Sequence, residues 1–148
     1  MKSIATVVIV AGLVLMGCAG ISSTSAANCD GTGACKVDVA VTNCVITPTP
    51  DSLTVTGKNI NIFWELDNAS TASFRFRDTD GVKLKQPDSD FDEPQSLANG
   101  KKFKLHNKNS KAAPGQQISY PYMINVQRFV SPNWVDCPPL DPVIINKG

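Results

Sequence analysis

The sequence predicts an all-β fold: a single antiparallel β-sandwich of about seven or eight short strands, stapled by disulfide bonds. Three observations point to it. After residue 28, no long stretch has apolar residues at helical spacing, whereas alternation of apolar and polar residues recurs along the chain. Clusters of Pro, Gly, Asn and Asp separate the alternating segments, which are all short. The same region carries an even number of cysteines, as a disulfide framework requires.

Each expected strand rests on its own alternation. The first, at 36–43, turns Val37, Val39 and Val41 to one face. Thr79-Asp80-Gly81 has the composition of a hairpin turn and leads into a strand at 82–84. Pro121, within the longest alternation at 118–126, indicates an edge strand or a bulge. The remaining strands are expected at 53–55, 59–66, 73–77, 103–105 and 143–145.

The N-terminal residues predict an export signal. Lys2 precedes an uncharged, mostly apolar run at 4–16, which is shorter than the roughly 20 residues that cross a bilayer. The segment Leu15-Met16-Gly17-Cys18 resembles a bacterial lipobox, although Met16 stands where Ala, Ser or Thr is usual. This interpretation makes 1–17 the signal peptide, Cys18 the lipidation site, 18–28 a tether and 29–148 the folded domain.

A second cleavage position stays open. Ser25 and Ala27 are small residues at the spacing that an ordinary signal peptidase needs, so the signal could instead comprise 1–27. The first interpretation predicts a cell-envelope lipoprotein that meets the membrane through a lipid on Cys18. Ala19 is not the Asp associated with inner-membrane retention, so the outer membrane is favoured. The second interpretation predicts a soluble periplasmic or secreted protein.

The cysteine count agrees with export. Either cleavage removes Cys18 from the pool and leaves Cys29, Cys35, Cys44 and Cys137, which predict two disulfides. A strand at 36–43 would hold Cys35 and Cys44 roughly 30 Å apart, too far for a bond between them. Of the two remaining connectivities we favour Cys29–Cys35 with Cys44–Cys137, because Gly31 and Gly33 permit a tight loop between the first pair.

The net charge of the chain is near zero, which excludes strong electrostatic binding to nucleic acid. The sequence has 14 Lys and Arg, of which Lys2 belongs to the signal, against 13 Asp and Glu. The charges are nevertheless segregated, with acidic residues crowded at 78–93 and lysines crowded at 101–111. Residues Lys102, Lys104, His106 and Lys108 would share one face of the strand near 103–105. They form a candidate stripe for an anionic partner, or else a solvent face paired with the acidic segment.

No constellation for catalysis or metal binding is recognised. His106 is the single histidine, and no Gly-x-Ser-x-Gly motif accompanies it. A blue-copper site needs two histidines and a cysteine, and Cys137 is expected in a disulfide. The segment 88–93 alternates carboxylates, but Glu93 and Asn99 stand where an EF-hand requires Gly and Glu. We therefore expect no catalytic residues, no metal and no cofactor, and a solvated acidic loop at 88–93.

Three segments of the chain carry a family resemblance. Trp64-Glu65-Leu66, the run from Tyr120 to Val126, and the run from Asp141 to Asn146 resemble a group of small exported bacterial β-sandwich proteins of unassigned function. In that group a Trp-x-Leu, Tyr-x-Tyr-x-Ile-x-Val and Asp-Pro-x-Ile-x-Asn order recurs. The resemblance supports the sandwich fold and implies no activity. The size of the domain and the combination of Trp64 with Tyr120 and Tyr122 are typical of an immunoglobulin-like or cupredoxin-like architecture.

These observations favour a non-enzymatic domain. The leading hypothesis is a binding or structural domain of the cell envelope or of the secreted proteins, with an unknown envelope or extracellular partner. One alternative is an enzyme or enzyme accessory acting on envelope polymers, in which Asp90 and Asp92 could provide acid–base chemistry. Another is an exported inhibitor-like module. An exposed apolar patch would favour partner binding, whereas a cleft with converging carboxylates would favour the enzyme.

Overall fold

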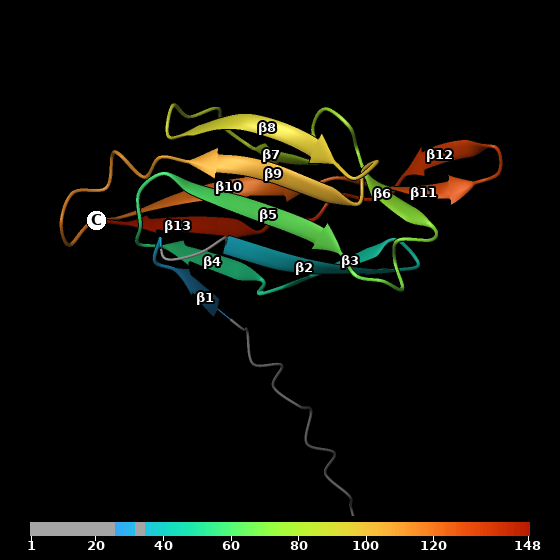
Figure 1. The fold of residues 1–148 in the computed structure, drawn as a ribbon, viewed down its shortest axis with the longest axis horizontal. Coiled ribbons are helices and arrows are strands. Elements are labelled where there is room, and N and C mark those ends of the chain that lie inside the picture. The colour runs from blue at the N-terminus through green and yellow to red at the C-terminus, as the bar shows by residue number, and fades with distance from the viewer. Residues whose placement is uncertain (1–25, 32–34) are drawn as a thin grey trace, which may run out of the picture.

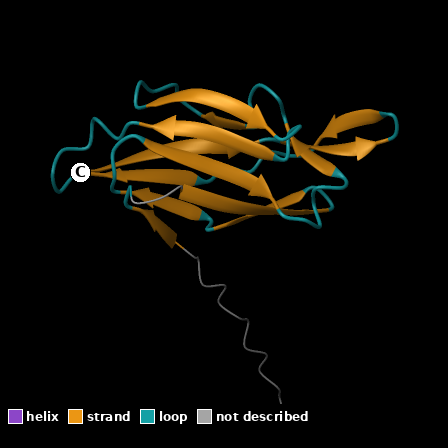
Figure 2. Ribbon diagram, viewed as in Figure 1, coloured by secondary structure: helices purple, strands orange, loops and turns teal. Residues whose placement is uncertain are grey.

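In the computed structural model, the described residues are 26–31 and 35–148. The signal peptide expected at 1–17 and the lipidation site Cys18 lie outside them. The described residues form thirteen strands and no helix (Figure 2). No helix among them is long and apolar enough to cross a membrane. The strands are β1 Ala26–Cys29, β2 Cys35–Thr42, β3 Val45–Thr49, β4 Ser52–Val55, β5 Ile60–Leu66, β6 Phe74–Phe76, β7 Val82–Leu84, β8 Phe91–Leu97, β9 Lys102–Asn107, β10 Gln117–Ile124, β11 Val126–Val130, β12 Asn133–Asp136 and β13 Val143–Lys147.

The strands make two five-stranded sheets and one small sheet. One large sheet has the order β1-β4-β13-β10-β7, and the other has the order β3-β2-β5-β9-β8. The third sheet, β12-β11-β6, extends from one end of the molecule as a protruding hairpin (Figure 1). The predicted all-β sandwich class is confirmed.

The prediction of a purely antiparallel sandwich is wrong. Strand β2 pairs in parallel with β5, and β4 pairs in parallel with both β1 and β13. The reason is the path of the chain: after the β2–β3 hairpin it crosses to the opposite sheet as β4, then returns as β5 beside β2. A crossover of this kind brings two strands of one sheet together in the same direction.

The expected number of strands is too low, because the strand expected at 118–126 forms two strands, β10 and β11, and four further strands were not anticipated. They are β1, β3, β8 and β12. Strand β3 contains Pro48, which the sheet tolerates because β3 is an edge strand. Strand β8 starts within the segment expected to be a solvated loop. Strand β1 includes 26–28, so the end of the expected tether is paired with β4 rather than extended into solvent.

The expected hairpin at Thr79-Asp80-Gly81 does not form. Strands β6 and β7 do not pair with each other; β6 pairs with β11, and β7 pairs with β10. The turn lies opposite Asn125, whose N–H donates to the Gly81 carbonyl at 2.8 Å and whose side-chain amide donates to the Asp80 carbonyl at 2.6 Å. A Cβ at Gly81 would lie 2.7 Å from both the Arg77 carbonyl oxygen and the Phe103 ring, so close packing requires glycine here.

The strand expected at 118–126 forms two strands, β10 and β11, separated at Asn125. Strand β10 lies inside its sheet, between β13 and β7. Pro121 is therefore not on an edge strand. It occupies a point opposite Lys85, one residue beyond the end of β7, and the Lys85 N–H donates to its carbonyl at 2.9 Å. Proline has no N–H to donate, and at this point β7 has ended, so no hydrogen bond within the β7–β10 pair is lost.

The core lies between the two large sheets. Two buried pairs of side chains connect the sheets across it, one aromatic pair and one pair of amides. Trp64 on β5 and Tyr122 on β10 are fully buried and meet edge to face, with ring centroids 5.5 Å apart. Asn107 on β9 and Asn146 on β13 are also fully buried and exchange two amide hydrogen bonds of 2.7 and 3.0 Å. The pairing satisfies polar groups that would be costly to bury alone.

Two disulfides tie the strands together, with the pairing favoured from the sequence. Cys29–Cys35 joins the end of β1 to the start of β2, and Cys44–Cys137 joins the β2–β3 turn to the residue after β12. Disulfides form and persist in oxidising compartments, so they indicate an extracytoplasmic environment.

Candidate functional site

The candidate cationic stripe lies beside the acidic strand β8 and is largely paired. Lys104 Nζ lies 2.9 Å from Glu93 Oε2, and Lys108 Nζ lies 2.7 Å from Asp92 Oδ2. His106 Nδ1 lies 2.6 Å from the other oxygen of Asp92, and its side chain is only 19% exposed. The antiparallel register of β8 and β9 places Asp92 directly opposite His106. Three members of the stripe thus contact acidic side chains of β8, which is the arrangement described by the alternative of a solvent face paired with the acidic segment.

The charges around Asp92 act mainly within the domain. Hydrogen bonds from Lys108, then from His106, hold the pKa of Asp92 below its ordinary value. The fourth member of the stripe, Lys102, has its Nζ 4.5 Å from the Phe63 ring centroid, at a cation–π distance. Each member of the stripe therefore has a partner inside the domain, a carboxylate for three of them and an aromatic ring for Lys102.

Asp90 is not part of a solvated loop, as the sequence had led us to expect, but is fully buried. One of its oxygens accepts from the Ser110 hydroxyl at 2.5 Å and from the Ser110 N–H at 3.1 Å. The other accepts from the Tyr120 hydroxyl at 3.2 Å and from the Lys111 N–H at 3.3 Å. Burial acts to raise the pKa of Asp90, but these hydrogen bonds outweigh it and hold the pKa below the ordinary value.

Asp88 and the other acids of this segment are also engaged by the domain. Asp88 accepts from Lys111 Nζ at 2.7 Å, and this bond is the main reason that its pKa is lowered. Its carboxylate also accepts from the Asp90 N–H at 2.8 Å. Across residues 26–31 and 35–148, no group of three or more His, Cys, Asp or Glu side chains is placed to hold a metal ion.

The protruding hairpin formed by β11 and β12 carries exposed apolar side chains. Phe129 is 45% exposed, Val130 is 44% exposed and Val135 is 51% exposed. The register pairs Phe129 with Trp134 and Arg128 with Val135, so apolar side chains occupy both faces of the hairpin. Figure 1 shows that this hairpin projects beyond the two large sheets. Exposed apolar clusters on a soluble domain commonly mark interaction surfaces.

One face of the hairpin is anchored at its base by cations. The Arg75 guanidinium lies 4.5 Å from the Trp134 ring centroid, while its Nε donates to Gln127 Oε1 at 2.9 Å. Gln127 in turn donates to Asp136 at 2.9 Å. Lys101 Nζ lies 5.7 Å from the same Trp134 ring and donates to the carbonyls of Thr71 and Phe74. Burial, and then the charge of Arg75, lower the pKa of Lys101.

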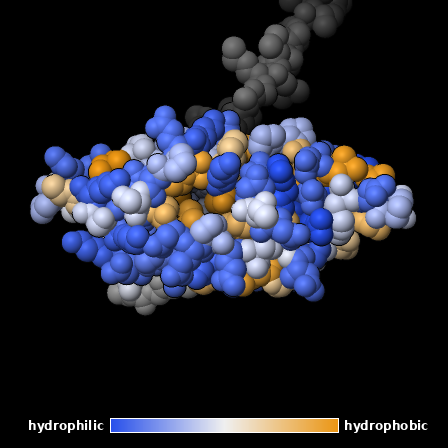
Figure 3. Space-filling view, turned by 90° about the horizontal axis from the view of Figure 1, so that it is seen from above, coloured by the Kyte–Doolittle hydropathy of each residue, from blue (hydrophilic) through white to orange (hydrophobic). Residues whose placement is uncertain are grey.

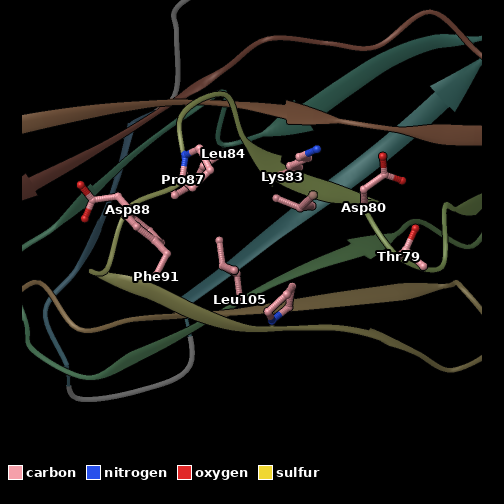
Figure 4. A pocket seen from close by; sticks show the side chains of 10 residues that line it. Thr79, Asp80, Lys83, Leu84, Pro87, Asp88, Phe91 and Leu105 are labelled. Carbon is pink, nitrogen blue, oxygen red and sulfur yellow. The ribbon is translucent and has the colours of Figure 1, made fainter.

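A second feature is a groove at the open edge of the sandwich, between the edge strands β7 and β8. It has a volume of about 450 Å³. Its apolar floor is made by Val82 and Leu84 from β7, Phe91 from β8 and Leu105 from β9 (Figure 4). Seen from above, this face shows apolar surface in a central hollow surrounded by hydrophilic residues (Figure 3). The groove is distinct from the hairpin and shares no lining residue with it.

Sequence reasoning identified neither the hairpin nor the groove. A signal for the hairpin was present, because Ser131-Pro132 separates two short apolar runs at 129–130 and 134–135, as a turn separates paired strands. The groove had no local signal, since its floor combines β7, β8 and β9, which are brought together only by the fold.

The chain was compared with protein-family models and with curated protein sequences, and neither comparison gave a match.

Proposed function

We propose that this protein is a non-enzymatic, exported binding domain that contacts a partner protein through the hairpin β11–β12. The observation that carries the proposal is the exposure of Phe129, Val130 and Val135 together on one projecting element. A domain of this size has enough core to bury such residues, and it buries the other aromatic clusters between its sheets. Exposure of three large apolar side chains to water is unfavourable in free energy, and burial of these side chains against a partner would explain why the domain keeps them exposed.

The hairpin is also held ready for binding. The contacts of Arg75 with Trp134 and Gln127, together with the bond from Gln127 to Asp136, fix the two strands on one face. A preorganised surface loses less conformational entropy on association than a flexible one. Trp and Arg are also the residue types that most often dominate binding energy at protein interfaces. The expected partner is therefore a protein surface with an apolar hollow.

The location of the domain is proposed to be the cell envelope, with Cys18 as the lipidated residue and the outer membrane as the favoured site. The resemblance to small exported bacterial β-sandwich proteins supports this location. Pairing of β1 also supports it, because cleavage after Ala27 would remove Ala26 and Ala27 from their places opposite Ser52 and Leu53. Loss of palmitate labelling in a Cys18→Ala variant would support lipidation. A mature protein that begins near Asn28 would contradict it.

The contacts of the carboxylates favour the binding function over the enzyme alternative. Asp90 already accepts four hydrogen bonds inside the domain, and Asp92 pairs with Lys108 and His106. Acid–base chemistry requires a carboxyl group that can reach a substrate and whose pKa suits proton transfer. Both pKa values are shifted downward instead.

Affinity capture from an envelope extract tests the proposal. The bait is the mature domain, compared with a Phe129→Ser/Val135→Ser variant and with a Val45→Ser control. Val45 is 66% exposed on β3, so the control removes exposed apolar surface outside the hairpin. We expect a discrete partner that is retained by the wild type and by Val45→Ser and lost by the hairpin variant. Equal recovery by all three baits would contradict the proposal.

A further inference from the structure

The two faces of the hairpin β11–β12 differ in what covers them. Side chains alternate along a strand, so Trp134 and Gln127 share one face, which Arg75 contacts. The opposite face, which we call the open face, carries exposed side chains from both strands: Arg128 and Val130 from β11, and Asn133 and Val135 from β12. Val135 lies directly opposite Arg128 in the register. The open face therefore places one cation among apolar side chains.

Arg128 differs from the other arginines of the chain in its contacts. Arg75 lies over the Trp134 ring, and Arg77 lies 3.0 Å from Asp80. The side chain of Arg128 is exposed, and it makes no ion pair, hydrogen bond or ring contact with residues 26–31 or 35–148. Its guanidinium therefore keeps its N–H donors available for a partner.

A hollow of about 390 Å³ adjoins the open face at the base of the hairpin. Strand β6 places Phe74 directly opposite Arg128, on the other side of β11, and both residues line the hollow. Val41 adds an apolar wall, while Thr42 and Ser73 add hydroxyl groups. No Asp or Glu is among the described residues that line it. The hollow thus gives a partner room to reach Arg128 where no carboxylate of the domain competes.

Burial of the open face has an electrostatic consequence. A partner that covers Val130 and Val135 also removes water from Arg128, because the three side chains are neighbours on one face. Burial of an unpaired charge is strongly unfavourable, so such a partner must supply an anionic group at this point. The planar guanidinium matches the two oxygens of a carboxylate in a bidentate pair. The open face therefore fits a partner with an Asp or Glu side chain set among apolar ones.

Two other occupants fit the open face less well. A second copy of the open face, related by two-fold symmetry, would bring another Arg128 and no carboxylate, because its remaining side chains are neutral. Insertion of the hairpin into a bilayer would begin with its tip, where Ser131 and Asn133 are polar and exposed. The apolar side chains lie along the face, which suits lateral contact with a protein surface.

We propose that the partner of the hairpin is a protein that presents a carboxylate side chain flanked by apolar side chains. The carboxylate pairs with Arg128, and the apolar side chains cover Val130 and Val135. This inference rests on the proposed function, since it specifies the chemistry of the partner that the same hairpin binds.

Selection from a phage-displayed library of randomised peptides tests this chemistry. The baits are the mature domain, Arg128→Glu and Lys58→Glu, and peptides that also bind Phe129→Ser/Val135→Ser are removed first. Lys58 is the control position, because it is exposed outside the hairpin and makes no ion pair within the described part of the chain. We expect the wild type and Lys58→Glu to select peptides with Asp or Glu between apolar residues, whereas Arg128→Glu should select Lys or Arg there.

The selected sequences separate this inference from the proposed function. Peptides that require Phe129 and Val135 but carry no acidic residue would overturn the inference and leave the proposed function standing. Absence of any peptide that requires the hairpin would contradict both. Acidic peptides selected equally well by Arg128→Glu would overturn the pairing of the carboxylate with Arg128.

Affinity measurements on one selected peptide show whether its carboxylate contacts Arg128 directly. Arg128→Gln should weaken binding about tenfold or more, and so should replacement of the acidic residue of the peptide by its amide. The two changes together should weaken binding no more than either alone, because both remove the same ion pair. Losses that multiply would overturn direct pairing. Lys58→Gln should leave the affinity unchanged, and both variants should retain wild-type chemical shifts at residues distant from the substitution.

Vesicles of phosphatidylcholine and anionic phosphatidylglycerol test a membrane as the alternative partner. We expect no co-sedimentation of the mature domain, produced without a lipid, with these vesicles. Co-sedimentation that is lost in both Arg128→Gln and Phe129→Ser/Val135→Ser would overturn the assignment of a protein partner to the open face.

Discussion

The indole N–H of Trp64 donates a hydrogen bond to the hydroxyl of Tyr122 at 3.2 Å, between the two large sheets. Trp64 belongs to β5 and Tyr122 to β10, so the bond ties one sheet to the other where neither side chain reaches water. Burial raises the pKa of Tyr122 to about 12, which keeps its hydroxyl protonated across the physiological range. The two rings therefore pack against each other, and the hydrogen bond between them gives a partner both to the buried indole N–H and to the buried hydroxyl.

Removal of the Tyr122 hydroxyl should destabilise the domain. Tyr122→Phe leaves the Trp64 N–H buried without an acceptor, which costs about 1–3 kcal/mol. The free energy of unfolding, measured by urea titration, reports this loss. A cycle with Trp64→Phe checks the cause, because the double variant should lose less stability than the sum of the two single variants. Strict additivity would show that the hydrogen bond contributes nothing.

The two disulfides should differ in their contribution to stability. The Cys44–Cys137 bond closes a loop with a sequence separation of 93, whereas the Cys29–Cys35 bond has a separation of 6. In the chain-entropy model, removal of the first costs about 4–5 kcal/mol and removal of the second costs about 2 kcal/mol. Serine replacement of each pair, followed by chemical unfolding, measures the difference. A larger loss for the Cys29–Cys35 variant would contradict this account.

The buried carboxylate of Asp90 should make the free energy of unfolding depend on pH in the acidic range. Its pKa in the folded state lies below the ordinary value of 3.8, so its stabilising contribution is present above that pH. The contribution is lost as the pH falls below 3.8 through the folded-state pKa. Asp88 and Asp92 have pKa values shifted in the same direction and add to the loss.

Replacement of Asp90 isolates its share of this dependence. Asp90→Asn turns an acceptor-only group, surrounded by donors, into one that also donates, and should cost about 1–3 kcal/mol at neutral pH. The difference in unfolding free energy between wild type and variant should shrink as the pH falls below 3.8. A difference that stays constant between pH 7 and pH 2 would show that Asp90 does not titrate with unfolding.

Arg75 should hold the hairpin in place. Arg75→Met keeps an apolar stem but removes the cation above Trp134 and the donor to Gln127. We expect the amides of β11 and β12 to exchange hydrogen about fivefold faster, corresponding to about 1 kcal/mol of local stability. Arg128→Met is the control, because Arg128 alternates with Gln127 and so projects from the opposite face. Equal acceleration in the control would refute the anchoring role of Arg75.

Local sequence patterns predicted the strands whose alternation matches one buried face. Strand β2 alternates buried and accessible residues along its whole length, and so does β5. The length of the same strand excluded a bond between Cys35 and Cys44, and the glycines between Cys29 and Cys35 favoured the observed pairing over the other one that remained. By contrast, β3 and β8 contain Pro48 and Pro94, and both tolerate proline because they are edge strands. Edge position is a property of the assembled sheet and cannot be seen in the strand's own residues.

The environment of the carboxylates was not predictable for a related reason. Asp90 lies in a run of acids that would ordinarily be solvated, yet Ser110, Lys111 and Tyr120 supply its donors from distant parts of the chain. Lys102, Lys104 and His106 alternate with buried residues on one face of β9, and Lys108 follows the last residue of that strand. The partners of this stripe on β8 became visible only with the register that sets Asp92 opposite His106.

Site-specific photo-crosslinking in the exporting cell tests the central claim, that the hairpin is the partner-binding surface. A photoreactive amino acid replaces Val135 on β12, and Gln116 serves as the control position. Gln116 is exposed and its carbonyl accepts from Gly148 at the C-terminus, at the end of the molecule opposite the hairpin (Figure 1). We predict a discrete adduct from position 135 that disappears with Phe129→Ser, and none from position 116. An adduct from position 116 with none from position 135 would contradict the account.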